Sequence, residues 1–388
     1  MKYRLDDIFD LQMGKTPSRN NLEYWETQDN KWISIGDLSQ SGKYISKTKE
    51  YLSNEAVRQS GIKIIPAGTV IMSFKLSIGK TAITQEDMYS NEAIMAFHDK
   101  KVVEMLPEYI YYLFKCKDWD KGTNKAVMGK TLNKATLSQI QVDICSIEEQ
   151  HRIVKNLNDV SEFIDNIKML QDDLDMLIKS RFVEMFGDTV MNSMKWEEHF
   201  LNEYVTFLTS GSRGWAQYYT DECGEVFITI KNVKNNHISL DNVQYINAPN
   251  NKEAQRTKVQ TGDLLISITA DLGRTGVVEE DIATMGAYIN QHLSLVRLDS
   301  SKINPLYVSY FLETDGGKRQ FESKNQNGVK AGLNFDAIKS LKILVPPLEL
   351  QNDYLDSVAS VDKLKVELQK TMNETQILFD SLMQKYFG

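Results

Sequence analysis

The sequence predicts an α+β protein made of two similar mixed α/β domains in tandem, each followed by a long helix. Three observations predict this fold class. The chain repeats itself at an offset of about 195 residues, and each half contains short β-branched and aromatic runs bounded by glycine turns. Each half also ends in a long segment with heptad spacing and no internal glycine or proline. A repeat this long is not a solenoid unit, whose period is roughly 20–50 residues.

The duplication covers the whole chain. Its offset is 194 or 195 residues in the globular parts and 201 at the ends of the long helices, which indicates small loop insertions. Corresponding segments are Ser34–Leu38 with Thr229–Val233, Gly79–Thr81 with Gly273–Thr275, and Phe186-Gly187 with Phe387-Gly388.

Each globular part is expected to contain short strands and a proline-initiated helix. The strands are predicted at Lys31–Ile35 and Thr69–Ser73 in the first half, and at Val226–Ile230 and Asp263–Ile268 in the second. Amphipathic helices with proline in the first turn are predicted at Pro107–Phe114 and Pro305–Leu312.

The two long segments are expected to pair with each other as an antiparallel coiled coil with pseudo-two-fold symmetry. In both, apolar residues step by three and four, which are heptad a and d positions. The predicted pairing residues are Val160, Phe163, Ile167, Leu170, Leu174, Leu177, Val361, Leu364, Leu368, Leu378 and Leu382, with Thr371 and Thr375 in the same stripe. A second stripe (Leu157, Ile164, Ile178, Met185) lies beside the first and either seats a partner or is buried within the protein.

These patterns divide the chain into domains 1–146 and 189–345 and spacer helices 147–188 and 346–388. The net charge of −8 lies on the helices, because residues 147–188 contribute −5 and residues 347–388 contribute −3. The globular domains are therefore neutral overall, and a locally basic face on them is compatible with DNA binding. A neutral domain binds DNA weakly without specific contacts or a partner that supplies positive charge.

The composition also predicts the compartment. No apolar run reaches the roughly 18 residues of a membrane span, and no secretory signal opens the chain. Three scattered cysteines favour a reducing cytoplasm over a disulfide framework.

Several motifs, in order and in duplicate, resemble one known family. The entry pattern is Gly14–Arg19, Tyr24-Trp25 and Trp32–Leu38, and the exit pattern is Asn334–Ile338 followed by Ile343–Gln351 with its Pro-Pro-x-x-x-Gln. The chain resembles the specificity (S) subunit of type I restriction-modification systems over its whole length. The first copy departs from the pattern twice. Ile144–Gln150 has lost both prolines, and Asn91-Glu92 stands where the second copy has Asn290-Gln291.

The resemblance implies that each globular region is a target-recognition domain that reads one half of a bipartite, non-palindromic target in double-stranded DNA. The helices would fix the half-site separation and dock two methyltransferase (M) subunits, which restriction (R) subunits join. The S-adenosylmethionine, ATP and Mg²⁺ would be bound by those partners, and this chain would bind no cofactor or metal and catalyse nothing. A helix of about 35 residues is about 50 Å long, which suits half-sites a DNA turn, about 34 Å, or more apart.

Base reading in the major groove uses Arg or Lys for guanine and Asn or Gln for adenine, on loops held by a scaffold. The predicted DNA-binding residues of the first domain are Lys15, Arg19, Lys75, Lys80, Lys130 and Lys134. Those of the second domain are Arg213, Trp215, Tyr218, Tyr219, Lys231, Asn232, Arg274, Asn290, Gln291 and Lys330. A single loop lysine is more often solvated surface, so the set carries the prediction.

The enzyme alternatives have weaker support. Gly-Lys-Thr occurs at Gly14, Gly79 and Gly129, but none has the glycine five residues earlier that a nucleotide-binding P-loop requires. These loops either contact phosphate or are ordinary polar turns. Glu322-Ser323-Lys324 is the remaining nuclease-like pattern, and the five histidines show no metal-ligand spacing. A coiled-coil interaction scaffold without base readout remains the main alternative, and a metal-dependent nuclease the lesser one.

Overall fold

The computed structural model describes residues 1–75, 77–119, 124–126, 129–221, 224–269, 271–324 and 332–388. The chain forms two compact units. Unit 1 comprises Met1–Met169 and Gln369–Gly388, and unit 2 comprises Leu170–Leu368. The predicted α+β class, with two mixed α/β domains and two long helices that pack together, is confirmed. Among the described residues, no helix combines the length and hydropathy that a bilayer span requires.

Unit 1 is built around a five-stranded sheet in the order β2-β9-β6-β7-β4. These strands are β2 (Phe9–Met13), β9 (Ile94–Asp99), β6 (Val70–Ser73), β7 (Thr81–Thr84) and β4 (Tyr44–Ile45). A three-stranded sheet contains β5 (Glu50–Leu52), β3 (Asn30–Ile33) and β8 (Tyr89–Ser90), while β1 (Lys2–Arg4) pairs with β12 (Gln141–Asp143) and β10 (Asn124–Ala126) with β11 (Gly129–Thr131). The short helices are α1 (Leu5–Ile8), α2 (Ile35–Gln40), α3 (Asn54–Ser60), α4 (Pro107–Cys116) and α5 (Lys134–Ser138).

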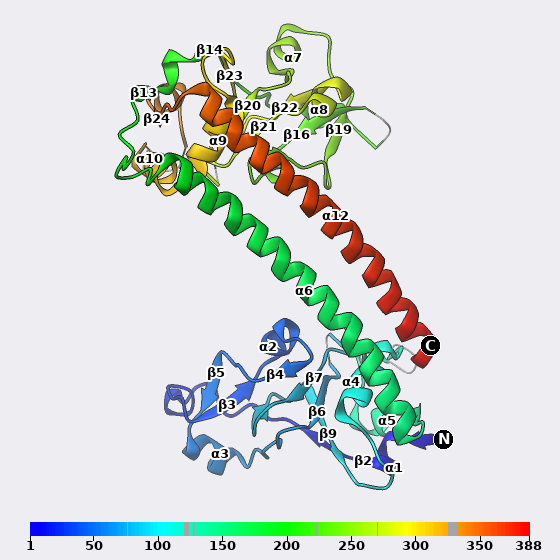
Figure 1. The fold of residues 1–388 in the computed structure, drawn as a ribbon. Coiled ribbons are helices and arrows are strands. Elements are labelled where there is room, and N and C mark those ends of the chain that lie inside the picture. Colours follow the sequence, from blue (N-terminus) through cyan, green and yellow to red (C-terminus); the bar gives the residue numbers. More distant parts are fainter. Residues whose placement is uncertain (76, 120–123, 127–128, 222–223, 270, 325–331) are drawn as a thin grey trace. The chain divides into compact units, whose positions relative to one another are not determined.

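The central strands of unit 1 are buried on both faces of the sheet, because a hydrophobic core covers each face. Successive side chains of a strand point to opposite faces, so alternate residues join different cores. Val70 and Met72 of β6 join the core beneath α4, whereas Ile71 joins a second core with Ile33 of β3. Figure 1 shows α4 against β6 and β7. Helix α4 begins at Pro107, where the missing N–H costs no helical hydrogen bond.

Unit 2 repeats this plan with the sheet order β14-β23-β20-β21. These strands are β14 (Val205–Ser210), β23 (Leu293–Leu298), β20 (Leu264–Ser267) and β21 (Thr275–Val277). The second sheet contains β15 (Tyr219–Thr220), β19 (Gln244–Ile246), β16 (Glu225–Ile228) and β22 (Ala287–Ile289). Two shorter pairs are β13 (Glu198–Phe200) with β24 (Lys342–Leu344) and β17 (Val233–Lys234) with β18 (His237–Ile238).

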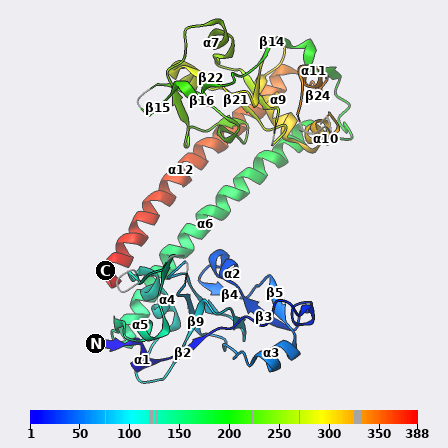
Figure 2. The ribbon, with the colours of Figure 1, turned by 180° about the vertical axis from the view of Figure 1, so that it is seen from behind.

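The helices of unit 2 are α7 (Lys252–Thr257), α8 (Glu280–Met285), α9 (Pro305–Glu313), α10 (Asp315–Lys324) and α11 (Phe335–Lys339). Of these, α7, α9 and α11 correspond in chain order to α3, α4 and α5, whereas α8 and α10 have no helical counterpart among the described residues of unit 1. Figure 2 shows α9 beside β21, as α4 lies beside β7 in unit 1. The predicted proline-initiated helices and the predicted strands therefore form where the sequence places them.

The long helices α6 (Ile147–Phe186) and α12 (Leu348–Phe387) pack antiparallel within each unit. In unit 1, the Asn156 amide donates to the Tyr386 hydroxyl at 3.0 Å. In unit 2, the Tyr354 hydroxyl donates to the Ile178 carbonyl, and Lys365 pairs with Asp175. Residue numbers therefore fall along one helix as they rise along the other.

Each long helix is anchored at its start by a fully buried glutamine. In unit 1, Gln150 accepts from the Leu106 amide at 2.9 Å and donates to the carbonyls of Glu104 and Cys145. In unit 2, Gln351 accepts from Asn304 at 2.9 Å and donates to Pro346 at 2.8 Å. The same side chain thus ties each helix to the proline-initiated helix of its domain, although the first junction has no prolines.

Candidate nucleic-acid interface

In unit 1, four loops meet at one end of the central sheet. We call the described residues of segments 14–19, 73–75, 77–80, 90–94 and 130–134 the first loop frame. Main-chain hydrogen bonds hold them together at 2.9–3.1 Å, and the donor–acceptor pairs are Gly14 to Ile94, Lys15 to Ser90, Phe74 to Ala93 and Leu132 to Phe74. Because the backbone fixes these loops, their side chains are displayed on a rigid scaffold.

Unit 2 contains the same arrangement in segments 211–219, 267–269, 271–275, 289–293 and 332–334, the second loop frame. Its corresponding donor–acceptor pairs are Gly211 to Leu293, Ser212 to Ile289, Ile268 to His292 and Leu333 to Ile268, at 2.9–3.0 Å. The same four bonds therefore recur although the loop sequences differ.

Two glycine pairs explain why the repeated motifs sit in these loops. A Cβ on Gly14 would lie 2.2 Å from the Asn91 carbonyl oxygen, and one on Gly211 would lie 2.0 Å from that of Asn290. Gly79 and Gly273 form the second pair and have positive φ values of 88° and 80°. In the Gly79 loop, the Gly79 amide donates to the Ser73 carbonyl at 2.9 Å and the Lys80 amide donates to Ser73 Oγ at 3.1 Å. These internal bonds favour the interpretation of Gly79-Lys80-Thr81 as a turn.

The first loop frame brings several predicted DNA-binding lysines to one end of the sheet. Lys15 is exposed, and its ammonium donates to the Ser60 carbonyl. Lys75 is half-buried beside the Phe74 ring, and Lys134 is exposed as the first residue of α5. The Lys80 side chain lies toward α2, because its ammonium donates to Ser39 Oγ of that helix at 2.5 Å. Lys130 lies in β11, and its side chain is outside the described part of the chain.

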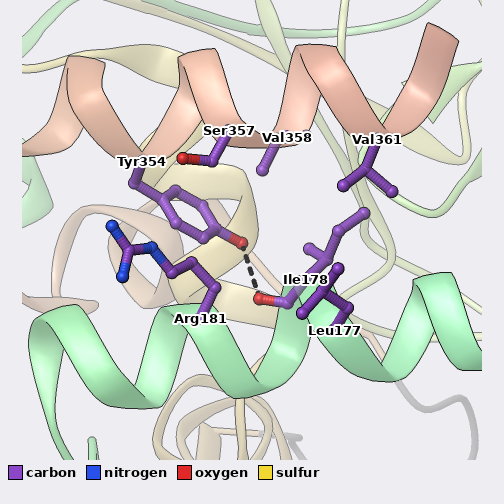
Figure 3. Close-up of a pocket in the computed structure, with 7 residues that line it drawn as sticks. All are labelled: Leu177, Ile178, Arg181, Tyr354, Ser357, Val358 and Val361. Atoms are coloured by element: carbon purple, nitrogen blue, oxygen red, sulfur yellow. Dashed lines mark hydrogen bonds between the residues drawn. The ribbon is translucent and has the colours of Figure 1, made fainter. Parts of the chain in front are cut away.

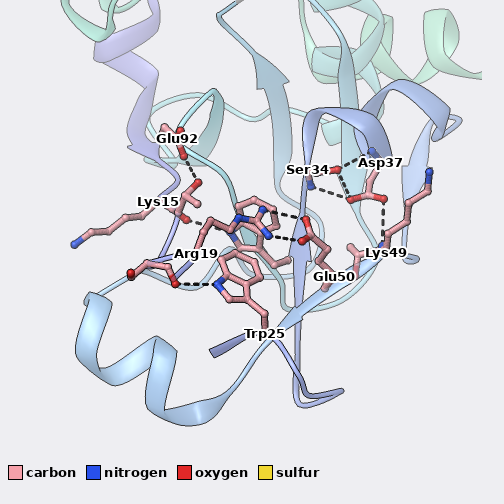
Figure 4. Close-up of polar contacts among 12 residues, drawn as sticks. Lys15, Arg19, Trp25, Ser34, Asp37, Lys49, Glu50 and Glu92 are labelled. Atoms are coloured by element: carbon pink, nitrogen blue, oxygen red, sulfur yellow. Dashed lines mark hydrogen bonds and ion pairs between the residues drawn. The ribbon is translucent and has the colours of Figure 1, made fainter. Parts of the chain in front are cut away.

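Arg19 lies in a cluster that satisfies much of its charge. Its guanidinium is 3.7 Å from the Trp25 ring centroid and pairs with both carboxylate oxygens of Glu50 (Figure 4). About half of the side chain, 48%, remains exposed. In this structure Arg19 organises the entry loop, and any DNA contact would compete with Glu50.

In unit 2, Arg213 and Lys231 are exposed, and Arg274 is exposed but pairs with Asp271 at 2.5 Å. Asn290 and Gln291 are half-buried in the turn between β22 and β23. Lys330 lies outside the described residues. The second loop frame therefore brings together Arg213, Asn290 and Gln291, while Lys231 lies in the short helix η4 (Ile230–Asn232).

The aromatic residues of the predicted loop divide into core and surface. Trp215 is only 3% exposed, and it stacks on Phe227 while its indole N–H donates to Glu253. Tyr218 is half-buried, and Tyr219 is 47% exposed. The structure therefore argues against DNA contact by Trp215, because burying its ring stabilises the domain core.

Asn232 is also buried, at 2% exposure. Its carboxamide oxygen accepts from the Thr229 amide and hydroxyl, and its NH₂ donates to the Ser239 carbonyl. Asp37 occupies the corresponding position in unit 1, where it accepts from Ser34. Asn232 is thus a capping residue rather than a base reader, and the Ser/Thr-x-x-Asp/Asn spacing is the sequence signal that indicates this role.

The helix-pairing prediction is corrected at alternate positions. Members of the predicted stripe that are buried or half-buried are Val160, Ile167, Leu174, Val361, Leu368 and Leu382. Phe163, Leu170, Leu177, Leu364 and Leu378 are 50–56% exposed. Leu157, Ile164 and Ile178 of the second stripe are also buried on α6, and Val358 is buried on α12. Successive helical residues are 100° apart, so a seam moved by one residue exposes the neighbouring positions.

The helix pair also leaves a shallow apolar groove in unit 2. It has a volume of about 130 Å³ and is lined by Leu177, Ile178, Arg181, Tyr354, Ser357, Val358 and Val361. Figure 3 shows Tyr354 reaching from α12 to the Ile178 carbonyl on α6, with Arg181 at the rim. The groove adjoins the exposed Leu177, and both features suit an apolar partner surface.

Two polar contacts between globular parts and helices had no clear sequence signal. In unit 1, the Lys43 ammonium donates to Asn158 on α6 at 2.6 Å, and burial lowers the pKa of Lys43. In unit 2, His237 lies 3.4 Å from Asp362 on α12 and 2.7 Å from Glu279, and these carboxylates, Asp362 first, raise its pKa. Such contacts join residues more than 100 positions apart, which spacing along the chain does not reveal.

The described residues contain no group of three or more His, Cys, Asp or Glu side chains placed to hold a metal. Glu322, the residue of the nuclease-like pattern, is exposed on α10.

A family model for the type I restriction modification DNA specificity domain matches the chain twice, at residues 1–175 and 195–376. The chain belongs to this family. The resemblance predicted from the motifs is thereby confirmed, and each match covers a globular part and most of the helix that follows it.

Curated relatives of this specificity family are only distantly similar. The specificity subunit of the type I restriction enzyme MjaIX of Methanocaldococcus jannaschii is 29% identical over 204 residues, which are 52% of this chain and 46% of that protein. The putative MjaX specificity subunit of the same organism is 24% identical over 319 residues, 76% of this chain and 71% of that protein. The first of these matches thus spans about half the length of the relative.

Solved structures share the fold. The type I restriction-modification S subunit from M. genitalium matches with a TM-score of 0.55 at 14% identity and covers 100% of this chain and 96% of its own. A chain from a study of assembly and conformational transition in the type I system matches with a TM-score of 0.61 at 18% identity and covers 100% and 97%.

Proposed function

We propose that this chain is a sequence-specific DNA-binding subunit that reads a bipartite, non-palindromic target and positions methyltransferase and restriction subunits on it. Residues 1–146 and 189–345 would each read one half-site, and residues 147–188 and 346–388 would form the spacer. The chain itself would be non-catalytic and act in the cytoplasm, with S-adenosylmethionine, ATP and Mg²⁺ bound by its partners.

The observation that carries this proposal is the pair of loop frames. Four equivalent main-chain hydrogen bonds recur in the two units, yet they display Lys15, Lys75 and Glu92 in one and Arg213 and Gln291 in the other. A constant frame with different donors and acceptors is what two different half-sites require, because each base pair presents its own pattern in the major groove.

The charge distribution supports the same division of roles. The acidic excess lies on the long helices, so the globular parts carry no net repulsion toward DNA. Exposed Lys15 and Lys134 in unit 1 and Arg213 and Lys231 in unit 2 supply local positive charge for phosphate contacts. The modest number of such side chains favours assembly with partners that add further positive charge.

The long helices also carry exposed apolar side chains. Unit 1 leaves Phe163 and Leu378 exposed, and unit 2 leaves Leu170, Leu177 and Leu364 exposed. Exposed apolar surface marks interaction sites, so these positions support docking of the methyltransferase subunits. They would equally serve a scaffold without base readout, and the loop frames are what favour the DNA-binding function over that alternative.

The test exchanges residues 1–146 for the corresponding domain of another specificity subunit and maps methylated sites in a host that lacks other such systems. We expect one half-site to change and the other to persist, because the chimera keeps both helices and the second loop frame. Co-purification of the methyltransferase subunits with the chimera is the control for assembly. A target that changes in both half-sites, or in neither with assembly intact, would refute modular reading.

A further inference from the structure

One side chain in each loop frame is projected from an unusually well-fixed turn. In unit 1 this residue is Glu92, between β8 and β9. The Asn91 carboxamide oxygen accepts from the Ala93 amide at 2.8 Å, and the Asn91 carbonyl accepts from Ile94 at 3.1 Å. Phe74 of the neighbouring loop donates to the Ala93 carbonyl at 3.0 Å. The backbone on both sides of Glu92 is therefore held in place.

The turn between β22 and β23 in unit 2 is built from the same bonds. Asn290 accepts from the His292 amide through its side chain and from the Leu293 amide through its carbonyl, both at 3.1 Å. Ile268 donates to the His292 carbonyl at 2.9 Å. The residue in the position of Glu92 is Gln291. The frame thus presents a carboxylate in one unit and a carboxamide in the other.

The carboxamide of Gln291 is oriented by its neighbours. Its NH₂ nitrogen lies 3.2 Å from His292 Nε2, and the Thr269 hydroxyl lies 2.6 Å from His292 Nδ1. An NH₂ group only donates, so Nε2 accepts and the ring proton is on Nδ1, facing Thr269. One amide hydrogen is used in this way. The other hydrogen and the carbonyl oxygen remain as an adjacent donor and acceptor.

The carboxylate of Glu92 is likewise fixed from one side. The Thr16 hydroxyl donates to Glu92 Oε2, so Thr16 of the entry loop orients the group and Oε1 remains as an acceptor. Glu92 is exposed and Gln291 is half-exposed. Both side chains are accessible to a ligand that approaches this end of the sheet.

Their chemistry selects different bases. A glutamine side chain bonds adenine in bidentate fashion, accepting from N6 and donating to N7, whereas a glutamate accepts from the N4 amino group of cytosine. We infer that position 92 and position 291 are equivalent base-reading positions, Glu92 reading a cytosine in one half-site and Gln291, oriented by His292, reading an adenine in the other. This inference rests on the proposed function, which leaves the bases open.

The test measures binding of the complete complex to its target duplex and to duplexes with each base pair substituted in turn. For Gln291→Glu we expect discrimination at one adenine of the second half-site to fall at least about tenfold, because a bidentate pair contributes about that much or more. Glu92→Gln should do the same at one cytosine of the first half-site. His292→Phe should weaken discrimination at the Gln291 position by a smaller factor, because the amide is then no longer oriented.

Matched controls carry the same chemical change near the end of the same sheet that lies opposite the loop frame. Gln260→Glu precedes β20, and Glu104→Gln follows β9, so neither should alter base preference. If Gln291→Glu weakened all sequences equally, Gln291 would be a phosphate contact and the inference would be wrong. It would also be wrong if every preference stayed within twofold. If the unaltered complex bound all duplexes equally well, the proposed function itself would be refuted.

Discussion

The two units differ least where they are most buried and most where they are exposed. Gln150 and Gln351 are both completely buried and tie the long helices to their domains in the same way. Glu92 and Gln291 occupy equivalent turns, where Glu92 presents only hydrogen-bond acceptors and Gln291 presents a donor and an acceptor. The duplication has therefore kept the residues that hold the frame and changed a residue that the frame displays. This contrast separates the residues that hold the frame from a residue that the frame presents at its end.

The largest expected effect tests the buried glutamines. Gln150→Leu would leave one donor and two acceptors without partners, and Gln351→Leu would leave one of each. Each buried orphan group costs about 1–3 kcal/mol, so we expect losses of about 4 and about 3 kcal/mol. Urea unfolding of the full chain, followed by circular dichroism, measures both losses.

The exposed Gln59 on α3 provides the control for these substitutions, because its side chain bonds only to Glu55 on the same helix. Gln59→Leu should change the free energy of unfolding by less than about 0.5 kcal/mol. If Gln150→Leu lowered the free energy of unfolding no more than Gln59→Leu does, the hydrogen bonds of Gln150 would contribute nothing to stability. The buried glutamines would then not have the same role in the two units.

Local signals predicted much of this frame, and tertiary packing decided the rest. Proline at helix starts, glycine turns and heptad spacing placed α4, α9, α6 and α12 because these signals act within a few residues. On α6 the predicted pairing residue Phe163 is exposed, whereas the neighbouring Ile164 of the second stripe is buried. The two apolar stripes lie side by side on this helix, and packing against the rest of the protein determines which positions are covered.

Prediction of the candidate site was limited for the same reason. Lysines and arginines on loops were found by residue type, but Trp215 and Asn232 have the right chemistry and are buried. Glu92 was not among the predicted DNA-binding residues because it carries the wrong charge for DNA. We inferred a role for Glu92 because the hydrogen bonds around its turn recur around Gln291 in the other unit. One bond of each set, Phe74 to Ala93 and Ile268 to His292, joins segments that are not adjacent in the sequence.

A smaller loss of stability is expected when alanine replaces Gly79 in unit 1 or Gly273 in unit 2. Gly79 and Gly273 have φ values of 88° and 80°, and a Cβ would lie 2.9 Å from the Trp119 ring and 2.3 Å from the Phe321 ring. Alanine at a positive φ costs about 1–2 kcal/mol, and displacing a buried ring adds about 1–2 kcal/mol. We expect Gly273→Ala to cost about 3 kcal/mol and Gly79→Ala about 2 kcal/mol, measured as unfolding free energies.

Gly68 and Gly262 separate the two contributions. They also have positive φ values, 77° and 83°, but a Cβ on either would meet no atom within 4 Å. Alanine at these positions should therefore cost only the backbone strain, about 1 kcal/mol. If all four substitutions cost the same, the ring contacts would be irrelevant, and Gly79 and Gly273 would be needed for backbone conformation alone.

The smallest expected effect concerns the contact between each globular part and its helix. Unit 1 uses Lys43, and unit 2 uses His237 between Asp362 and Glu279, with Lys365 3.8 Å from the Asp362 carboxylate. The two carboxylates, Asp362 first, raise the pKa of His237 above its ordinary value of 6.5. Protonated His237 therefore stabilises the folded state fully below about pH 6.5, and this stabilisation is lost as the pH rises through the raised pKa.

The His237 side chain is 35% exposed, so solvent screening keeps the contribution below about 1 kcal/mol. Urea unfolding between pH 6 and pH 9 should show a small decline in stability that is absent from His237→Gln, whose amide does not titrate in this range. Equal slopes for the two proteins would mean that His237 does not sense pH in the folded state. If stability declined more steeply with pH in His237→Gln than in the original protein, His237 would act with the opposite sign. The ion pairs with Asp362 and Glu279 could then not explain the pH dependence.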